Sequence, residues 1–442
     1  MIGGGMSHRG FMGARKKGVD PCAYVPGLYT EAEVDDLINI DGYIPVASAA
    51  EYRRITTGNS EDMGGCSQWA GTYTTGLDKK YIQIFDIDFE QVSTDFSGNT
   101  EATFVYDGNE LKQDNMPDAL FGTNSSGNVD SEIRNLRIST DFGVLVAGVG
   151  GFAVSRTNRC LVTNVIANVR CKKTGGNPFS ALYENQSDVG RTRNSRVIVD
   201  FYECEVSCGA FANGMRGEWT DCHSEGEIDS TANSIGGFGG NQLADGSYLR
   251  CSARVDVNGG SSTASFIGGG TGTGLTITAD ECFAIGTVNG TNAVALFWGQ
   301  NRRGLTVRNC YSRGVVTGSS FRAAGFICDP YAATTIENCY SAAEVSGASS
   351  NLGLVNFIQT GSTVTSSHWD TTIGPATSNG GAGARGRTTP QMQEGSEDSY
   401  ILPGGGVDGG SDPDNLMYEN WDPLIWEFLP GNAYPTLINN PE

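Results

Sequence analysis

The chain has 442 residues, of which 50 are Asp or Glu and 29 are Lys or Arg, so its formal net charge is −21. This charge excludes a main role in non-specific nucleic-acid binding, because phosphate contacts need a basic surface. No apolar run reaches the roughly 18 residues of a membrane-spanning helix, so we expect no membrane span. With 62 glycines and 18 % charged residues, the composition is not that of a helix-rich or coiled-coil protein.

Residues 1–40 are expected to form a flexible arm, which is basic over its first 17 residues, on this acidic chain. Its positive charges are Arg9, Arg15, Lys16 and Lys17. The pattern predicts a flexible arm that attaches the protein to an acidic partner, with a frayed terminus as the alternative. Charges stand where a secretory peptide would need its apolar run of about 7–15 residues, so we expect no Sec signal. Cys22 and Cys66 are the better candidates for a disulfide, to each other or to another subunit.

A repeat of 28 to 31 residues runs through the middle of the chain. Its copies are centred on Cys222, Cys251, Cys282, Cys310 and Cys339. Each copy joins an alternating strand to a turn and a short Gly-apolar strand, and none carries a crossover helix. Stacked copies of this kind form the coils of a β-solenoid. The predicted fold is all-β, a right-handed parallel β-helix over residues 67–385.

The repeat extends in both directions with looser spacing. Cys204 and Cys160 are the expected earlier positions, with an insertion at residues 172–193. In the forward direction, His368 follows Cys339 by 29 residues and is expected at a cysteine position. This last copy is a variant, as terminal repeats tend to be.

The repeated cysteines predict a ladder of small, buried apolar thiols. Coils lie about 4.8 Å apart, but in-register side chains on parallel strands point the same way, which disfavours disulfides. Cys204 and Cys208 are close in sequence, yet no second pair at zinc-finger spacing accompanies them. We therefore expect no metal site in the repeats.

Catalysis on a solenoid would need two carboxylates across a groove, about 5–9.5 Å apart in glycoside hydrolases. Asp86 with Asp88 is one local pair, and Asp200 with Glu203 is another. Both pairs lie in segments where a structural role accounts for the carboxylates. With only three histidines, the chain offers little material for histidine general-base chemistry. We expect a non-enzyme, with no catalytic residues assigned.

Binding is the stronger expectation, because outward residues of successive coils form rows on a rigid face. Trp298, Arg302 and Arg303 form a turn cluster, and Tyr331 follows one coil later. Aromatic rings beside charged groups are typical of sugar-binding surfaces. These four residues are the predicted ligand-binding site. Each aromatic side chain could instead fill the core or a subunit interface.

Residues 386–442 are expected to form an irregular C-terminal cap. Within them Asp408, Asp412 and Asp414 gather oxygen ligands on a Gly-rich loop, which would suit Ca²⁺, with a solvated acidic loop as the alternative. No other cofactor is predicted. A hydrophobic plug over the last coil is expected from Trp421, Trp426, Phe428 and Tyr434.

The chain resembles the GLUG-motif repeat proteins of bacteria and phages. The resemblance rests on the Asn-Cys-Tyr-Ser copies at Cys310 and Cys339 and on Gly353-Leu-Val and its relatives. It also covers Ile44 to Ile55, which looks like the opening helix of that family and implies a small helical cap over residues 41–66. The literal Gly-Leu-x-Gly motif is degraded in most copies.

The resemblance implies a surface-exposed attachment module and no common catalytic residue. Without a signal peptide, the expectation is a fibre, spike or decoration protein of a phage or phage-like particle, located on the virion surface. Its partners would be other virion structural proteins and host surface polysaccharide, and we expect a homo-oligomer, a trimer being one option. The alternatives are a secreted adhesin on the bacterial cell surface and a polysaccharide depolymerase.

Overall fold

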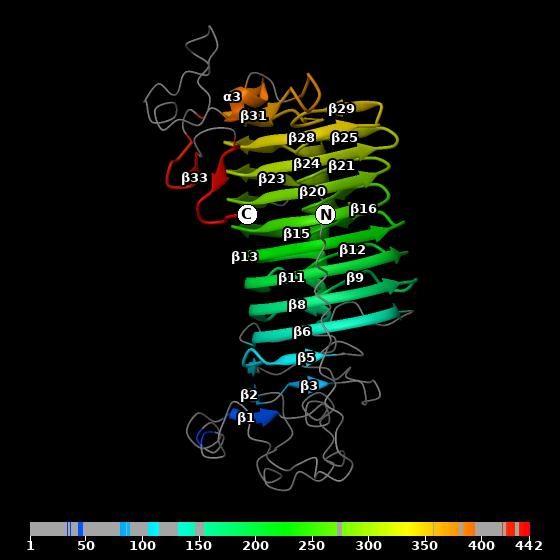
Figure 1. The fold of residues 1–442 in the computed structure, drawn as a ribbon, viewed down its shortest axis with the longest axis vertical. Coiled ribbons are helices and arrows are strands. Elements are labelled where there is room, and N and C mark those ends of the chain that lie inside the picture. Colours follow the sequence, from blue (N-terminus) through cyan, green and yellow to red (C-terminus); the bar gives the residue numbers. More distant parts are fainter. Residues whose placement is uncertain are drawn as a thin grey trace, which may run out of the picture.

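The computed structural model describes residues 33, 36, 43–46, 80–84, 86–88, 105–114, 131–145, 154–271, 276–356, 358–379, 383–393, 418, 421–428 and 433–442. These residues form a parallel β-solenoid whose coils stack along the long axis of the molecule (Figure 1). The predicted all-β parallel fold is confirmed. Among the described helices, none is long and apolar enough to cross a membrane.

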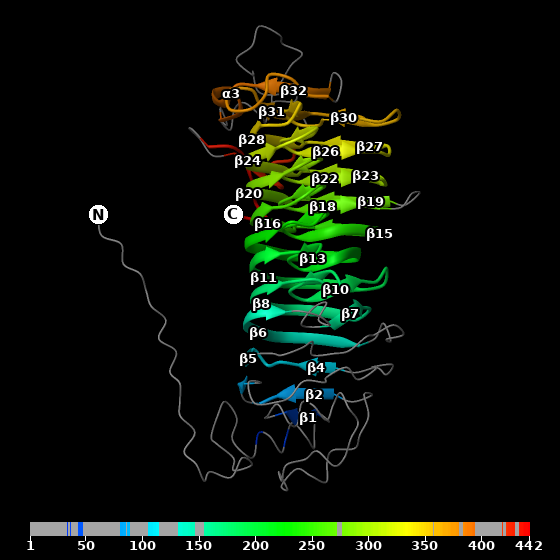
Figure 2. The ribbon, with the colours of Figure 1, turned by 90° about the vertical axis from the view of Figure 1, so that its right-hand side faces the viewer.

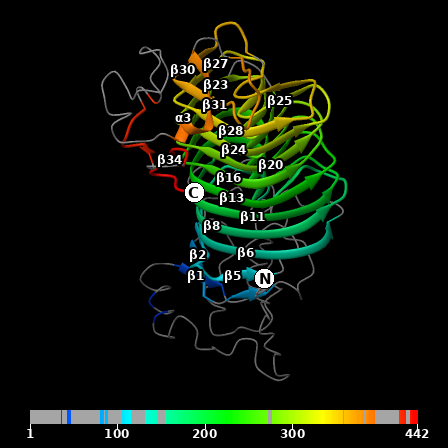
Figure 3. The same cartoon turned by 45° about the horizontal axis from the view of Figure 1, so that its top comes forward.

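Each regular coil contains four strands, which we number as columns 1 to 4 in chain order. In one coil these are β23 (Gly304–Arg308), β24 (Tyr311–Gly318), β25 (Arg322–Ala324) and β26 (Ile327–Pro330). Every column pairs in parallel with the same column of the next coil, as β24 does with β28 (Tyr340–Ser346). Column 3 forms a separate sheet, whereas the other columns share one large sheet. Figure 3 shows these curved layers obliquely, with the top of the stack tilted toward the viewer.

The remaining strands follow the same columns. Column 1 contains β1 (Tyr43–Val46), β2 (Lys80–Gln83), β4 (Val105–Asp107), β19 (Thr276–Asp280), β27 (Thr334–Glu337) and β30 (Thr363–Thr365). Column 2 contains β3 (Ile87–Asp88), β5 (Lys112–Asp114), β16 (Ser252–Asn258), β20 (Phe283–Gly290), β31 (Ser367–Asp370) and β32 (Ala384–Arg387). Column 3 contains β9 (Phe179–Ser180), β12 (Cys208–Gly209), β14 (Ile235–Gly236), β17 (Thr263–Ala264), β21 (Val294–Ala295) and β29 (Ser350–Leu352). Column 4 contains β7 (Val154–Asn158), β10 (Tyr183–Gln186), β18 (Ile267–Gly270) and β22 (Trp298–Asn301).

Several strands run through more than one column. These are β6 (Glu132–Leu145), β8 (Leu161–Lys173), β11 (Arg191–Cys204), β13 (Ala212–Ser230) and β15 (Gly239–Leu249). Outside the columns lie helix α3 (Thr389–Gln393) and the antiparallel pair β33 (Trp426–Glu427) and β34 (Thr436–Leu437). The segment at residues 172–193, expected to be an insertion, belongs to the ordinary coil path through β9 and β10.

A left-handed residue makes the corner between columns 1 and 2. Asn309 and Asn338 have φ of 49° and 52°, and residues in register, such as Asp221 at 52°, share this conformation. Asn tolerates the left-handed region better than most residues with a side chain. In five successive coils the residue directly after this corner is the ladder cysteine, so the Asn-Cys pair of the repeat marks a sharp turn.

The ladder thiols make hydrogen bonds that connect neighbouring coils. The backbone N–H of Cys251 donates to Cys282 Sγ at 3.3 Å, and Cys282 Sγ is 3.1 Å from the Asp280 carbonyl oxygen, to which it donates. Ser195 and Ser367 stand at the same position, and Ser367 Oγ accepts the Cys339 N–H at 3.2 Å. The thiols are therefore polar bridges as well as small core side chains, which the expectation of an apolar ladder missed.

The register corrects three expected ladder positions. Tyr340 pairs with His368, so Ser367 and not His368 follows Cys339 in the ladder. Cys204 pairs with Ser230 beyond the far end of column 2. Cys160 precedes β8, five residues before the ladder position of that coil. The loose spacing arose because these two cysteines occupy other corners of the solenoid.

The core follows the solenoid axis as stacked side chains. Its clearest row lies at the bend between columns 3 and 4, where neighbouring phenylalanine rings are separated by 4.7 to 4.8 Å between centroids. The row consists of Phe211, Phe238, Phe266, Phe297 and Phe326. This row fixes the shape of the bend in successive coils, because each ring packs on the ring of the next coil.

The expected helical cap at residues 41–66 is wrong at its start. Tyr43–Val46 forms strand β1, which pairs in parallel with β2, so solenoid pairing begins before residue 67. The other residues of the range 41–66 lie outside the described residues. At the far end, β32 pairs with β31 and carries the last coil to Arg387.

The C-terminal segment lies along the side of the solenoid and not over its end. We call residues 418, 421–428 and 433–442 the strap; its red ribbon lies beside β20, β24 and β28 in Figure 1. The Tyr340 hydroxyl donates to the Pro435 carbonyl oxygen at 2.7 Å, and Asn440 Nδ2 donates to the Glu281 carbonyl oxygen at 2.9 Å. The strap therefore runs back over several coils, which corrects the expected terminal plug.

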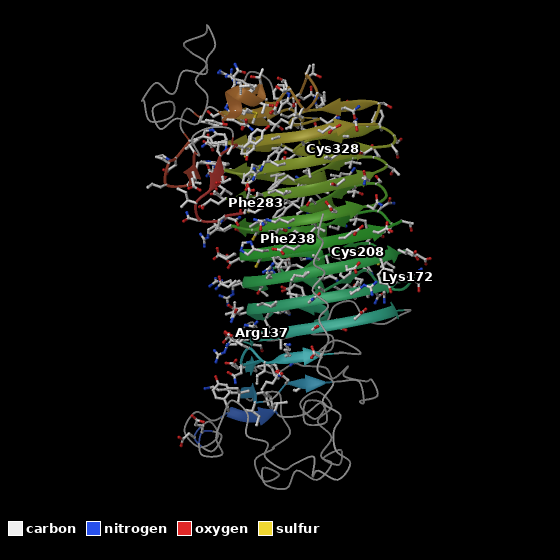
Figure 4. All side chains as sticks on the ribbon, in the orientation of Figure 1. Arg137, Lys172, Cys208, Phe238, Phe283 and Cys328 are labelled. Carbon is white, nitrogen blue, oxygen red and sulfur yellow. The ribbon has the colours of Figure 1, made fainter. Side chains whose placement is uncertain are left out.

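The strap covers a row of outward aromatic rings. Phe283, Tyr311 and Tyr340 directly follow ladder cysteines and stack at 5.0 Å between centroids. Trp426 packs against the last two of these rings at 6.1 and 6.0 Å. Figure 4 labels Phe283 on the side next to β33. The C-terminal aromatic residues therefore do pack against the solenoid, as expected, but they cover this outward row and not the end of the last coil.

Candidate aromatic and arginine binding patch

Trp298, the first predicted ligand-binding residue, faces the core. It opens β22, is fully buried, and contacts the Tyr248 ring edge-on at 6.2 Å between centroids. Its indole N–H donates to the Gln300 carbonyl oxygen at 3.2 Å. The side chain therefore has no surface to offer a ligand, and its predicted binding role is wrong.

Arg303 also lies inside the fold, with 3 % of its surface exposed. Its Nε donates to the Thr271 carbonyl oxygen at 2.7 Å, and Nη2 donates to the Leu243 carbonyl oxygen. Burial lowers the pKa of this guanidinium. Arg303 thus connects coils through backbone carbonyl groups, and its predicted contact with ligand is wrong.

Arg302 and Tyr331 remain on the surface and lie together. Tyr331 is 44 % exposed, and the Arg302 guanidinium lies 5.5 Å from the centroid of its ring. The two residues come from neighbouring coils, because Arg302 follows β22 and Tyr331 follows β26. The Tyr331 N–H donates to the Asn301 carbonyl oxygen at 2.6 Å, which fixes their spacing. These two predicted residues are brought together.

The structure adds Phe321 and Arg322 to this surface. Phe321 is 53 % exposed, and the Arg322 guanidinium lies 4.7 Å from its ring centroid. Arg322 begins β25, and its Nη1 forms an ion pair with Asp329 of β26. Because the chain bends sharply between these strands, their outer side chains meet. We define the aromatic–arginine patch as Arg302, Phe321, Arg322, Asp329 and Tyr331.

Sequence reasoning missed Phe321, although a signal was present. Register pairs Arg322 with Ser350 and Ala323 with Val294, so Phe321 stands at a turn where the neighbouring coils have Ser349 and Asn292. An aromatic side chain at a position that is otherwise small and polar has no core function there. Its exposure makes Phe321 a candidate surface residue rather than a core residue.

The electrostatics of the patch keep the Tyr331 hydroxyl neutral at physiological pH. Partial burial raises the pKa of Tyr331, and the nearby carboxylate of Asp329 raises it further, while Arg322 acts in the opposite direction. The phenol can therefore donate one hydrogen bond and accept others. The patch presents two ring surfaces, one hydroxyl and two guanidinium groups. In Figure 2 the strands before and after Tyr331, β26 and β27, follow one another at the same level of the stack.

The carboxylates considered for catalysis have structural contacts. Asp86 Oδ1 accepts the Lys112 N–H at 2.9 Å. Asp200 forms an ion pair with Arg170 at 2.6 Å, and Glu203 forms one with Lys172 of the preceding coil. Each of these three carboxylates thus stabilises a contact between strands or coils.

Three other predictions concern parts of the chain outside the described residues. The basic arm with Arg9, Arg15, Lys16 and Lys17, and the acidic loop with Asp408, Asp412 and Asp414, both belong there. So do Cys22 and Cys66. Within the described ranges, no group of three or more His, Cys, Asp or Glu side chains could hold a metal ion, and the ten cysteines are free thiols.

Comparisons with known proteins give little similarity. No family model matches the chain, and no curated protein matches it. One solved structure that resembles it is a crystal structure of a “putative immunoglobulin A1 protease” from Bacteroides ovatus, with 12 % identity and a TM-score of 0.36. That match covers 90 % of this chain and 92 % of the other.

Proposed function

We propose that this protein is an attachment protein that binds surface glycans through its aromatic–arginine patch. The observation that carries the proposal is the exposure of Phe321 and Tyr331. They are the exposed large aromatic residues among the described residues, and each has an arginine over its ring. The C–H faces of a sugar pack on aromatic rings, and the polar groups beside the rings bind hydroxyl groups.

The solenoid supports this role because it holds the patch on a rigid surface. Asp329 is 2 % exposed and is paired with Arg322, so the guanidinium over Phe321 is fixed from beneath. Tyr331 is fixed by its backbone hydrogen bond to the coil of Arg302. A binding surface that is already ordered loses less entropy when it meets a ligand.

For the biological setting we propose a fibre, spike or decoration protein of a phage or phage-like particle. The resemblance to GLUG-motif repeat proteins supports this setting, together with the arm at residues 1–40, whose basic first 17 residues would anchor the solenoid to other virion proteins. A bacterial cell-surface adhesin is the alternative setting. Both settings use the same glycan-binding surface.

The test is a binding measurement with the full chain on a panel of neutral and acidic polysaccharides. We expect Phe321→Ala and Tyr331→Ala each to weaken binding about fivefold, since a stacked ring contributes about 1 kcal/mol. Val189→Ala is the matched control, because Val189 is an exposed apolar residue outside the patch, 45 % exposed. Equal binding by all three variants, or binding to no polysaccharide, would contradict the proposal. Release of new reducing ends would show a depolymerase instead.

A further inference from the structure

Arg302 differs from most other basic residues of the solenoid surface. Eleven of them have a carboxylate of the same chain within 4.0 Å, as Arg308 has Glu337 at 2.9 Å. Within the described part of the chain, Arg302 has no such ion pair; its contact is the ring of Tyr331. The protein therefore neutralises most of its surface cations, and Arg302 is among the exposed ones that it leaves free to meet an anion.

The local charge of the patch is opposite to that of the whole chain. Two arginines and one aspartate give the patch a formal charge of +1, whereas the chain carries −21. Asp329 is buried beneath Arg322, so its carboxylate is directed at that guanidinium and not at solvent. A polyanion is repelled by most of this acidic surface, and the patch gives it one favourable contact.

We infer that the glycan bound by the patch is acidic, a polysaccharide of uronic acid residues. This inference rests on the proposed function and specifies its ligand. The sugar carboxylate pairs with Arg302, and the pyranose rings pack on Tyr331 and Phe321. Arginine suits this position, because its planar group stacks on an aromatic ring and still binds a carboxylate with two N–H groups.

The experiment compares polygalacturonate with the same polymer after its carboxyl groups have been reduced to alcohols. We expect the unmodified chain to bind polygalacturonate about tenfold more tightly, and raising the salt concentration to remove most of the difference. Arg302→Gln should abolish the preference. Arg308→Gln is the matched control, since Arg308 is an exposed arginine six residues further along the chain that is already paired with Glu337. It should keep the preference.

The outcomes separate this inference from the proposed function. Equal binding of the two polymers, with loss of binding in Phe321→Ala, would overturn the acidic ligand and leave glycan binding intact. Equal effects of Arg302→Gln and Arg308→Gln, or equally tight binding of dextran sulfate, would overturn the carboxylate assignment in favour of general attraction of anions. Binding to no polysaccharide of either panel would overturn both proposals.

Discussion

At the corner between columns 1 and 2, one small side chain has two functions. It fills the core, and its sulfur or oxygen atom accepts an N–H from the preceding coil while donating to a carbonyl two residues earlier. Cys282 does this with Cys251 and Asp280, and Ser367 does the same with Cys339 and Thr365. The interchange of Cys and Ser follows from this shared hydrogen bonding.

Cys282→Ala should therefore destabilise the protein more than Cys282→Ser. Alanine leaves the buried Cys251 N–H without its sulfur acceptor, and losing an acceptor of this kind costs about 1–3 kcal/mol. Serine keeps a donor and acceptor, as at Ser195 and Ser367. The free energy of unfolding, measured by denaturant titration, checks this order. If the two variants lost the same stability, packing of the sulfur would be the dominant contribution.

His368 makes stability depend on pH. It is fully buried between β32 and the strap, where the rings of Tyr418 and Trp421 lie 5.9 and 6.1 Å from its own. Burial, with Arg387 and Arg385 nearby, lowers its pKa from 6.5 to about 3. Between these values the unfolded chain binds a proton that the folded chain does not. The contribution of His368 to the free energy of unfolding is complete above pH 6.5 and is lost as the pH falls toward 3.

We therefore expect the melting temperature to fall as the pH is lowered from 6.5 toward 3, and to fall less steeply in His368→Phe. Thermal unfolding followed by circular dichroism across this range measures both slopes. His223→Gln is the comparison, since burial also lowers the pKa of His223 but leaves its ring partly exposed. Parallel slopes for the unmodified chain and His368→Phe would show that other groups govern the acid sensitivity.

At the scale of elements, the strap acts as a cover for the outward aromatic row. Without it, Phe283, Tyr311 and Tyr340 would present a large apolar strip to water on the face of a sheet. Such strips promote association. The contacts at Glu281, Pro435 and Ser366 hold the strap against several coils at once.

Trp426→Ala should lower the free energy of unfolding by about 3–5 kcal/mol, because the indole is 1 % exposed and packs on three rings. Leu424→Ala, two residues away and 77 % exposed, should change it little. Denaturant titration of both variants, with dye binding as a probe for exposed apolar surface, makes the comparison. Similar stability of the two variants would mean that the strap contributes little to the fold.

At the scale of the whole molecule, the period of the cysteines was enough to predict a stack of parallel coils. It could not give the register of the looser copies, because Cys204 and Cys160 occupy other corners. The start of the fold was misjudged because the family resemblance suggested a helix where Tyr43–Val46 pairs with β2. The strap could not be predicted, since nothing in a local pattern says which distant face an aromatic segment covers.

The candidate site was predictable in part. In register, Trp298 pairs with Ile267 and Ile327, and two aliphatic neighbours at one position indicate the core. That comparison would have removed Trp298 from the prediction. Arg302 and Tyr331 were found because both follow the end of a column 4 strand. Phe321 and Asp329 could not be predicted without knowing the bend between β25 and β26. An alternating pattern alone does not show that this bend brings their side chains close together.

The chemistry of the corner thiols also bears on the environments in which this fold can persist. Burial raises the pKa of Cys251, Cys282 and Cys310 well above that of a free thiol, so the reactive thiolate is scarce. Exchange with disulfides needs that thiolate. Where the structure describes them, the coils are therefore connected without any covalent bond that forms in oxidising surroundings or breaks in reducing ones. We therefore expect the described coils to be equally stable in reducing and in oxidising surroundings.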